Sequence, residues 1–300
     1  MIDWKKFAPI DVATLLYVTV ATAAVFRFGG ADRWGASWLL AANLLVVGVV
    51  LLAPRARVAG PVGHFVGNWY SIMMVTGLYA EVGVLNLDFG HHHDFAIQHL
   101  EQVVFGSQIS YRWIREMPNP ALSWVLHSCY LSYFAILISA PLGLWLSRRR
   151  DGARLTIFAI MATLYFCYIV NLFYPVAGPR YAFPHAHNAA TDVWPARATQ
   201  WLLNQADSWG AAFPSSHVAA SIVATLCALR FWRPLGLVLA PLTIGLAFGV
   251  VYGQFHYGVD ALTGIVVAAA MLTSLNRWVW WERAVEMQPA ADLRSSPLRL

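Results

Sequence analysis

The stretch that organises the sequence is VVYGQFHYGVDALTG, residues 250–264, which links the end of one apolar run to the start of the next. Within it, His256 and Asp260 stand four residues apart, where the second run begins. Side chains at this spacing lie on one face of a helix, so we expect the imidazole and the carboxylate to interact. An ionisable residue at the start of a membrane helix indicates a functional site.

A second stretch, FPSSH at residues 213–217, opens another apolar run with two hydroxyl groups and a second histidine. Pro214 favours the start of a helix, and we expect Ser216 to be its cap. The free N–H groups and the positive dipole end of such a helix attract an anion. Ser215 and Ser216 are therefore candidate phosphate-binding residues, and helix capping alone is the alternative role for both.

The chain as a whole is strongly apolar. Of its 300 residues, 59% are hydrophobic and 12% are charged, and the mean hydropathy is +0.55. A water-soluble domain does not need so much apolar material. Cys129, Cys167 and Cys227 lie inside apolar runs without disulfide or metal-binding spacing, so we expect them in the core. The net charge of +5 fits membrane orientation rather than a nucleic-acid partner.

The fold class that we predict is an all-α, polytopic membrane bundle of six to eight transmembrane helices. The first apolar run resembles a secretion signal, but Asp11 interrupts it and no cleavage site follows, so we expect a retained span. We expect one membrane domain at residues 1–286, with a catalytic core at about 121–281 and a flexible tail at 287–300. The eight apolar runs, each near the length that crosses the hydrocarbon layer, are residues 9–26, 37–53, 65–87, 121–146, 155–174, 213–231, 235–251 and 257–281.

The basic residues predict how the chain is oriented in a cell membrane. With eight spans, the outer face holds only six of the 20 Lys and Arg residues, namely Arg27, Arg33, Arg112, Arg115, Arg180 and Arg197. Positively charged loops favour the cytoplasmic side, so both termini are expected in the cytoplasm. The two histidine motifs then face the extracytoplasmic side.

One outer loop contains His91, His92, His93 and Asp94, followed by apolar residues at helical spacing. We expect a short helix in the membrane interface, with Phe95, Ile97, Leu100, Val103 and Val104 on its apolar face and Gln98, Glu101 and Gln102 opposite. The three histidines form either a metal site or a solvated loop. Adjacent histidines rarely converge on one ion, so we favour the solvated loop, and we also expect His185 and His187 to be ordinary loop residues.

Small residues at intervals of four predict close packing of the last three spans. Gly245, Gly249 and Gly253 form two overlapping Gly-xxx-Gly steps, and Ala220–Ala224 and Gly264–Ala268 repeat the pattern. Such surfaces let helices approach closely in lipid. We expect this packing to bring His217 and His256 together.

The residues in these motifs suit phosphoryl transfer. A phosphate ester resists attack because its charge repels nucleophiles and its alkoxide is a poor leaving group. His256, oriented by Asp260, can attack phosphorus while His217 protonates the departing oxygen. Arg180 can hold the phosphate through a bidentate guanidinium contact, or it can simply anchor the chain at the headgroups. This chemistry requires no metal and no other cofactor.

The same motifs resemble those of the type 2 phosphatidic acid phosphatase superfamily. Residues 214–217 are similar to its Pro-Ser-x-His motif, residues 256–260 to its His-x-x-x-Asp motif, and residues 178–180 to its upstream arginine segment. The resemblance implies that His256 is the phosphorylated nucleophile, that His217 is the general acid, and that Asp260 holds the nucleophile.

Two departures from the family pattern point to one branch. Phe173 and Val250 stand where the larger phosphatase branches carry a lysine and an arginine, and residues 251–257 are more similar to the inositol phosphorylceramide synthase group. This resemblance implies transfer of a phospho-head group from a membrane lipid to an alcohol, with water as the other acceptor.

Three other functions are open to the sequence. The first is a lipid phosphate phosphatase acting on phosphatidic acid or polyprenyl phosphate. The second is a lipid or anion transporter, which would place its charged residues near mid-membrane in two related halves. The charged motifs lie instead at the outer surface, and no internal duplication is visible. The third is a scaffold that retains the motifs without catalysis.

Overall fold

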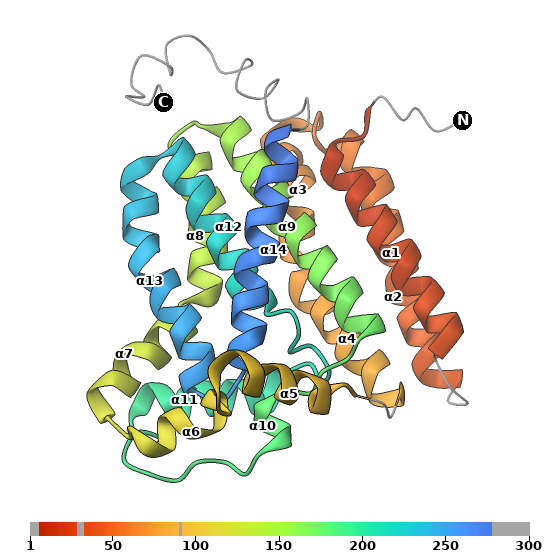
Figure 1. The fold of residues 1–300 in the computed structure, drawn as a ribbon. Coiled ribbons are helices and arrows are strands. Elements are labelled where there is room, and N and C mark those ends of the chain that lie inside the picture. The colour runs from red at the N-terminus through yellow and green to blue at the C-terminus, as the bar shows by residue number, and fades with distance from the viewer. Residues whose placement is uncertain (1–5, 29–32, 90–91, 278–300) are drawn as a thin grey trace.

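The computed structural model describes residues 6–28, 33–89 and 92–277, and most of them are helical (Figure 1). Within these ranges there is no β-strand, and a single bridge pairs Val176 with Ala211. The predicted all-α fold is confirmed. Four helices come from the first part of the chain: α1 (Pro9–Phe28), α2 (Arg33–Ala56), α3 (Gly60–Met73) and α4 (Val75–Phe89).

The remaining long helices surround α12 (Ser216–Phe231), which contacts α8, α9, α13 and α14. These helices are α8 (Tyr133–Leu146), α9 (Arg150–Phe173), α13 (Arg233–Tyr252) and α14 (Gly258–Arg277), and α7 (Pro120–Leu131) packs on α13. The start of α1 and the end of α14 lie at one end of the bundle, at the top of Figure 1. The short helices α5 (Asp94–Phe105), α6 (Ile109–Glu116), α10 (Pro179–Ala182) and α11 (Trp194–Ala206) lie at the opposite end.

Six of the eight apolar runs form helical segments that are long and apolar enough to cross a membrane in the part of the chain that the structure describes. A seventh is the pair α7 and α8, which is bent by 48° at Ser132. The Ser132 hydroxyl donates to the Cys129 carbonyl at 2.6 Å and so satisfies one carbonyl at the break. The eighth run is α12, whose 16 residues make it shorter than the others.

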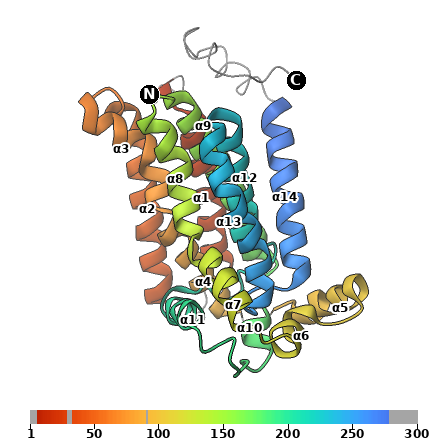
Figure 2. The ribbon, with the colours of Figure 1, turned by 90° about the vertical axis from the view of Figure 1, so that its left-hand side faces the viewer.

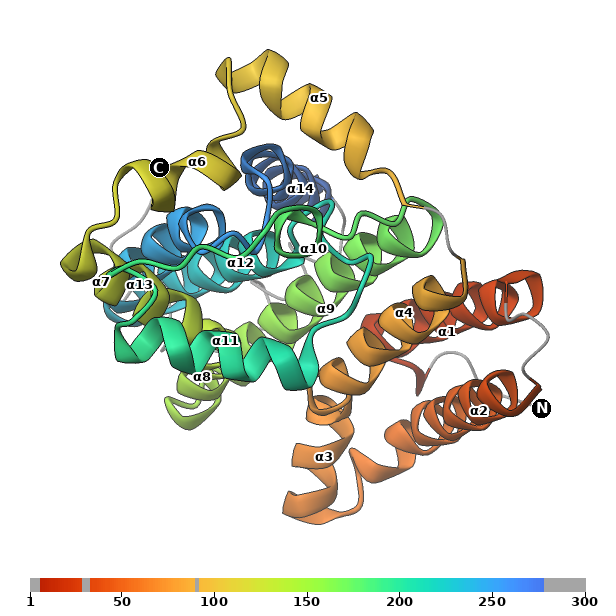
Figure 3. The same cartoon turned by 90° about the horizontal axis from the view of Figure 1, so that it is seen from below.

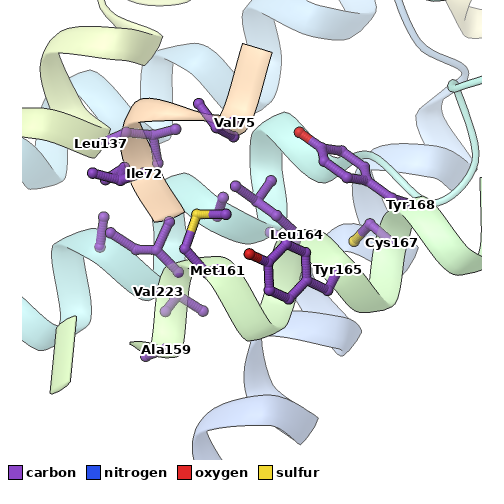
Figure 4. Packing of buried hydrophobic residues seen from close by; sticks show 14 of the residues in the cluster. Ile72, Val75, Leu137, Ala159, Met161, Leu164, Tyr165, Cys167, Tyr168 and Val223 are labelled. Atoms are coloured by element: carbon purple, nitrogen blue, oxygen red, sulfur yellow. The ribbon is translucent and has the colours of Figure 1, made fainter. Parts of the chain in front are cut away.

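The core is built around α9, whose span is 67% buried. Met161, Leu164 and Tyr168 of this helix pack among side chains from α3, α4, α8 and α12, as Figure 4 shows. The three cysteines are free and buried in the same core, as their apolar surroundings predict. This central helix connects the four N-terminal helices to the part of the chain that carries the histidines.

The glycine steps pack a different pair of helices from the one that we expected. A Cβ at Gly249 would lie 2.6 Å from the Leu126 carbonyl oxygen, and one at Gly245 would lie 2.4 Å from the Cys129 sulfur. Both contacts are to α7, so these glycines bring α13 close to α7. Gly264 meets the expectation, because a Cβ there would lie 2.7 Å from the Ser215 carbonyl oxygen at the start of α12. Only this last approach joins the two histidine motifs.

The predicted interfacial helix is α5, which lies across the end of the bundle and projects to its side (Figure 2). Seen from below, α5 and α6 curve around the end of α14 (Figure 3). Phe95, Leu100, Val103 and Val104 are exposed, as expected. Ile97 is buried with the polar face instead, because that face packs on the protein.

Candidate active site

His217 and His256 meet at the end of the bundle where the short helices lie. His217 is the second residue of α12, and His256 precedes the start of α14 by two residues. Their ring centroids are 5.6 Å apart, with the ring planes inclined by 61°. This separation lies inside the roughly 10 Å within which two groups can act on one phosphoryl group and its flanking oxygens.

Hydrogen bonding orients the His256 ring. Its Nδ1 lies 2.8 Å from the Ala212 carbonyl oxygen, and 3.5 Å from Oδ2 of Asp260. A carbonyl only accepts, so Nδ1 carries the proton and Nε2 of the neutral ring keeps its lone pair. The ring is buried, with 4% of the residue exposed. Burial and the fixed tautomer leave Nε2 as the basic nitrogen available for attack.

Asp260 connects the two histidine motifs. Its Oδ2 accepts a hydrogen bond from the Tyr257 backbone N–H at 2.8 Å, and its carbonyl oxygen accepts one from the Ser215 N–H at 3.1 Å. The spacing predicts Asp260 as the main partner of His256, but the Ala212 carbonyl is nearer. The carboxylate caps the first turn of α14, which holds it beside the imidazole rather than directly against it.

Aromatic rings surround His217. Its ring centroid lies 4.4 Å from that of Tyr133 and 5.6 Å from that of Tyr130. The Tyr79 ring is nearly perpendicular to it, with centroids 6.2 Å apart. The buried Nδ1 of His217 has no hydrogen-bond partner among the described residues. No carboxylate fixes the tautomer of this ring, so the ring is held mainly by packing.

Ser215, and not Ser216, caps α12. The Ser215 side chain accepts from the Val218 N–H at 3.4 Å, whereas Ser216 is the first helical residue. Both side chains are buried, and Ser216 lines a cavity beside His217. The helix therefore begins at Ser216, one residue earlier than a Ser216 cap implies.

Arg180 is the second residue of α10. Gly178 permits the turn before it, with φ at +94°, a conformation that side chains with a Cβ rarely adopt. Nη1 donates to Gln200 Oε1 at 2.7 Å, Nη2 donates to Asn204 Oδ1 at 2.5 Å, and Nε lies 3.6 Å from Oδ2 of Asp207. These contacts hold the guanidinium in place, and each Nη retains an N–H for a bound anion.

Residues 96–274 match the PAP2 superfamily, and this match covers more than half of the chain. It includes Arg180, both serines, both histidines and Asp260. The chain belongs to the PAP2 superfamily. Comparison with curated proteins and with solved structures found no match.

Membership of the PAP2 superfamily supports a phosphatase-type enzyme that acts on phosphate esters. Helices α1, α2, α3 and α4 precede the matched residues, and α5 enters the match at its third residue. The PAP2 region therefore contains the central helices and all of the short helices around the two histidines.

Asp94 is a residue of this PAP2 site whose role the sequence did not reveal. Its Oδ2 accepts from the Ala177 N–H at 2.7 Å, and its Oδ1 accepts from the Gly178 N–H at 2.8 Å. The hydroxyl of Tyr257, the residue after His256, also donates to Oδ1 at 2.9 Å. One buried carboxylate thus joins the start of α5 to two loops. The first is the arginine loop, residues 177–178 just before Arg180, and the second is the His256 loop, which contains His256 and Tyr257.

The inner face of α5 makes a second set of contacts with the His256 loop. Glu101 Oε2 accepts from the Gly258 N–H at 3.1 Å, and Gln98 donates to the Tyr257 hydroxyl at 2.9 Å. Burial raises the pKa of Glu101. Burial and the nearby charge of Asp94 raise the pKa of Tyr257 well above its usual range, so the phenol remains a hydrogen-bond donor.

His92 and His93 make separate contacts and do not converge. His91 lies outside the described residues. His92 Nδ1 lies 2.9 Å from Oδ2 of Asp94, and the His93 ring stacks on Tyr174 with centroids 4.0 Å apart. Across the described ranges, no group of three or more His, Cys, Asp or Glu side chains is arranged to hold a metal ion.

Two cavities approach the histidine pair from different sides. An apolar cavity of about 260 Å³ is lined by His217, Ser216 and the tyrosines around them. A polar cavity of about 390 Å³ is lined by Arg180, Gln254 and Phe255, and also by His185 and His187. A small space of about 20 Å³ is lined by His217, His256 and Phe255, among others. This space shares His217 with the apolar cavity and Phe255 with the polar one.

Proposed function

We propose that this PAP2 protein transfers a phospho-head group from a membrane lipid to an alcohol through a phosphohistidine at His256. The observation that carries the proposal is the position of the histidine pair. His256 has its Nδ1, and not its Nε2, on the Ala212 carbonyl, and its ring lies beside that of His217. A small space lined by both histidines shares His217 with the apolar cavity and Phe255 with the polar cavity. A phospholipid has the same division into apolar chains and a polar head on either side of phosphorus.

In the first step, the Nε2 lone pair of His256 attacks phosphorus and the bond to the lipid alkoxide breaks. His217, in its protonated form, gives its proton to the departing oxygen. The phospho-head group is then held on His256 by a P–N bond. The positive charge that develops on the imidazole is stabilised by Asp260, 3.5 Å from Nδ1, while Arg180 stabilises the charge on the phosphate oxygens.

In the second step, neutral His217 takes the proton of an incoming alcohol, whose oxygen attacks phosphorus and breaks the P–N bond. The product is a new phosphate ester, and the enzyme returns to its starting state with His217 protonated. Water can replace the alcohol in the same geometry, and the enzyme would then act as a lipid phosphate phosphatase.

Transfer to an alcohol is favoured by the surroundings of two positions. Val250 is fully buried, and its carbonyl oxygen accepts the N–H groups of Phe255 and His256 at 2.9 Å each. Phe173 is 52% exposed at the end of α9. Neither position carries the cation found in the larger phosphatase branches, which fits a diester with one phosphate charge better than a monoester with two.

The orientation that we propose for the cell membrane follows from charge. The end that carries α5, α6, α10 and α11 faces the extracytoplasmic side, and both termini are in the cytoplasm, because basic loops favour the cytoplasmic side. Substrate lipid and acceptor then meet at the outer leaflet. Labelling of single introduced cysteines from either side of sealed cells tests this arrangement.

One assay tests the function itself. The purified protein is given phospholipids with different head groups, with and without a polyol or lipid alcohol, and the products are resolved by mass. The proposal predicts a new phosphodiester that requires the added alcohol and a phosphorylated protein that is lost in His256→Ala. Release of phosphate without dependence on an alcohol would identify a lipid phosphate phosphatase, and binding without turnover would identify a transporter or a scaffold.

A further inference from the structure

The polar cavity has a composition that phosphoryl transfer at His256 does not require. It lies between α11, the loop at residues 183–192 and the turn that precedes His256. It has no lining residue in common with the apolar cavity. Its volume of about 390 Å³ falls within the range of roughly 300–1,000 Å³ that is usual for small-molecule sites.

Gln254 is the most informative residue of this cavity. Only 6% of it is exposed, and its Nε2 has no hydrogen-bond partner among the described residues. A buried amide without a partner is uncommon, because the group loses its hydrogen bonds to water and gains none. An unpaired donor that lines a polar cavity is explained if a ligand supplies the acceptor.

The backbone at Gln254 supports the same interpretation. Its φ is +61°, in the left-handed region that residues with a Cβ seldom occupy. The turn is held by the N–H groups of Phe255 and His256, which both donate to the Val250 carbonyl oxygen. Such strain persists where the surrounding structure imposes it, and it occurs often at ligand-binding sites. The same turn places the Gln254 amide in the cavity and His256 at the reacting centre.

The charge of the lining restricts the chemistry of the ligand. The lining contains two guanidinium groups, those of Arg180 and Arg197, and one carboxylate, that of Asp192. A second carboxylate, that of Asp207, lies 3.6 Å from Arg180 Nε but is not among the lining residues. Burial and the nearby charge of Arg180 lower the pKa of His185, whose neutral ring can both donate and accept. An excess of positive charge disfavours an ammonium group. Mixed donors and acceptors suit hydroxyl groups, which also do both.

The carboxamides of Gln200 and Asn204 add donors to this lining. Their oxygens accept from the Arg180 guanidinium, so the NH₂ group of each amide remains for other partners. Phe255 lines both this cavity and the small space that contains His256. A ligand in the polar cavity therefore extends towards the nucleophile.

We propose that the polar cavity is a binding site for a hydroxyl-bearing, uncharged or anionic group attached to the reacting phosphate, and that Gln254 Nε2 donates a hydrogen bond to it. The proposal rests on the proposed function, because it states which chemical group is bound on one side of the phosphate that His256 transfers. It excludes choline-like and ethanolamine-like head groups from this cavity.

Binding to protein that cannot turn over tests the proposal. Isothermal titration in detergent compares sorbitol 6-phosphate, phosphocholine and inorganic phosphate on His256→Ala protein. We expect sorbitol 6-phosphate to bind about tenfold more tightly than inorganic phosphate, as one or two additional hydrogen bonds provide. Phosphocholine should bind no more tightly than inorganic phosphate. Equal binding of all three, or a preference for phosphocholine, would overturn the assignment.

Two substitutions of Gln254 in the same background identify the contact. Gln254→Leu removes the donor, and Gln254→Glu keeps the shape while replacing the donor with an anionic acceptor. Both should remove the advantage of sorbitol 6-phosphate over inorganic phosphate. Gln102→Leu is the matched control, because Gln102 is exposed on α5 and lines neither cavity, and it should retain the advantage.

The outcomes separate this site from the proposed chemistry. If either folded Gln254 variant, judged by its unchanged thermal midpoint, retains the full preference, then Gln254 is not the contact and the proposal fails. If the binding preference is present but wild-type protein never forms a phosphohistidine, the binding site stands and the proposed function fails.

Discussion

The two histidines have different surroundings, and these surroundings predict different effects of substitution. His256 has its Nδ1 anchored on the Ala212 carbonyl and its Nε2 free, whereas His217 is packed among tyrosines. We expect His256→Ala to abolish both phosphorylation and turnover. His217→Ala should slow transfer from a lipid alkoxide by about 10²–10⁴-fold but slow release of nitrophenolate far less, because a good leaving group needs no proton.

Single-turnover rates with the two kinds of leaving group make this comparison. His99→Ala is a suitable control, since His99 is exposed on α5 and both rates should stay at the wild-type level. Near wild-type turnover in His256→Ala would show that the assigned nucleophile is wrong.

Asp94 is predicted to be a positioning residue. The Asp94 carboxylate accepts hydrogen bonds from two N–H groups of the arginine loop and from the Tyr257 hydroxyl. Asp94→Asn replaces one of its oxygens with an NH₂ group, which must then face one of these donors. We expect turnover to fall at least about tenfold, equivalent to about 1.4 kcal/mol. The affinity for inorganic vanadate, which depends on Arg180, should fall as well.

A double-mutant cycle distinguishes this role from general destabilisation. Tyr257→Phe removes one partner of Asp94, so its effect on turnover should be less than additive with that of Asp94→Asn. Asp151→Asn provides the control, because Asp151 pairs with Arg154 near the start of α9, at the other end of that helix from the arginine loop. Additive effects of the first pair would show that Asp94 does not act through Tyr257.

We expect helix α5 to couple the membrane surface to the site. Phe95 is 83% exposed and Val103 is 68% exposed, while Asp94 and Glu101 on the same helix hold the catalytic loops. Insertion of an apolar side chain into the interface contributes up to about 1.5–3 kcal/mol. We expect Phe95→Ser together with Val103→Ser to lower turnover of lipid in vesicles several-fold.

The control for α5 is Val58→Ser with Val62→Ser, which changes two exposed valines at the opposite end of the bundle. Turnover measured at fixed lipid concentration in vesicles should fall only for the α5 pair. Equal turnover of both double variants would show that the apolar face of α5 does not support the site.

The N-terminal helices depend on a buried ion pair. Asp11 is fully buried and accepts from both Nη atoms of Arg57 at 2.6 Å, and the Tyr70 hydroxyl donates to the same carboxylate at 2.8 Å. Removing one partner leaves an uncompensated charge, so Asp11→Ala should destabilise the fold by about 3–5 kcal/mol.

Thermal unfolding in detergent measures this effect. Glu116→Ala removes the partner of Arg112 in an exposed pair, with side chains 51% and 54% exposed, and should change stability by at most about 1 kcal/mol. If the two variants unfold at the same temperature, the buried pair does not stabilise the N-terminal helices.

For the whole molecule, the proposed chemistry uses only side-chain and backbone groups. Turnover should therefore persist in excess chelator, measured by release of the lipid alcohol before and after dialysis against it. A loss of activity that zinc restores would instead assign a metal role to the histidine loop before α5, and would replace the mechanism proposed above.

Much of the architecture follows from the sequence because its signals are local. An apolar run of span length predicts a membrane helix whatever its neighbours are. The spacing of His256 and Asp260, and the prolines and serines before His217, likewise specify short segments of chain. These signals correctly predicted the helical class, the presence of helix α5 and the buried cysteines. The place of α5 in the membrane interface stays a prediction.

Other features needed the tertiary structure because the contacts join distant residues. Asp94 reads as part of a histidine-rich loop, yet its partners lie 83, 84 and 163 residues along the chain. The Gly245 and Gly249 steps predict close packing, but periodicity does not say which helix approaches, and the partner is α7.

The sequence by itself therefore determined the helices and indicated the histidine pair and the arginine as candidate site residues, because residue type and spacing are properties of a short segment. Only the tertiary structure decided that the Ala212 carbonyl is nearest to His256 Nδ1, that Asp94 joins residues 177 and 178 to Tyr257, and that a small space lined by both histidines shares lining residues with two larger cavities. The physical reason is that these contacts depend on how α5, α11 and α12 pack, and packing is set by the shape of every neighbour at once.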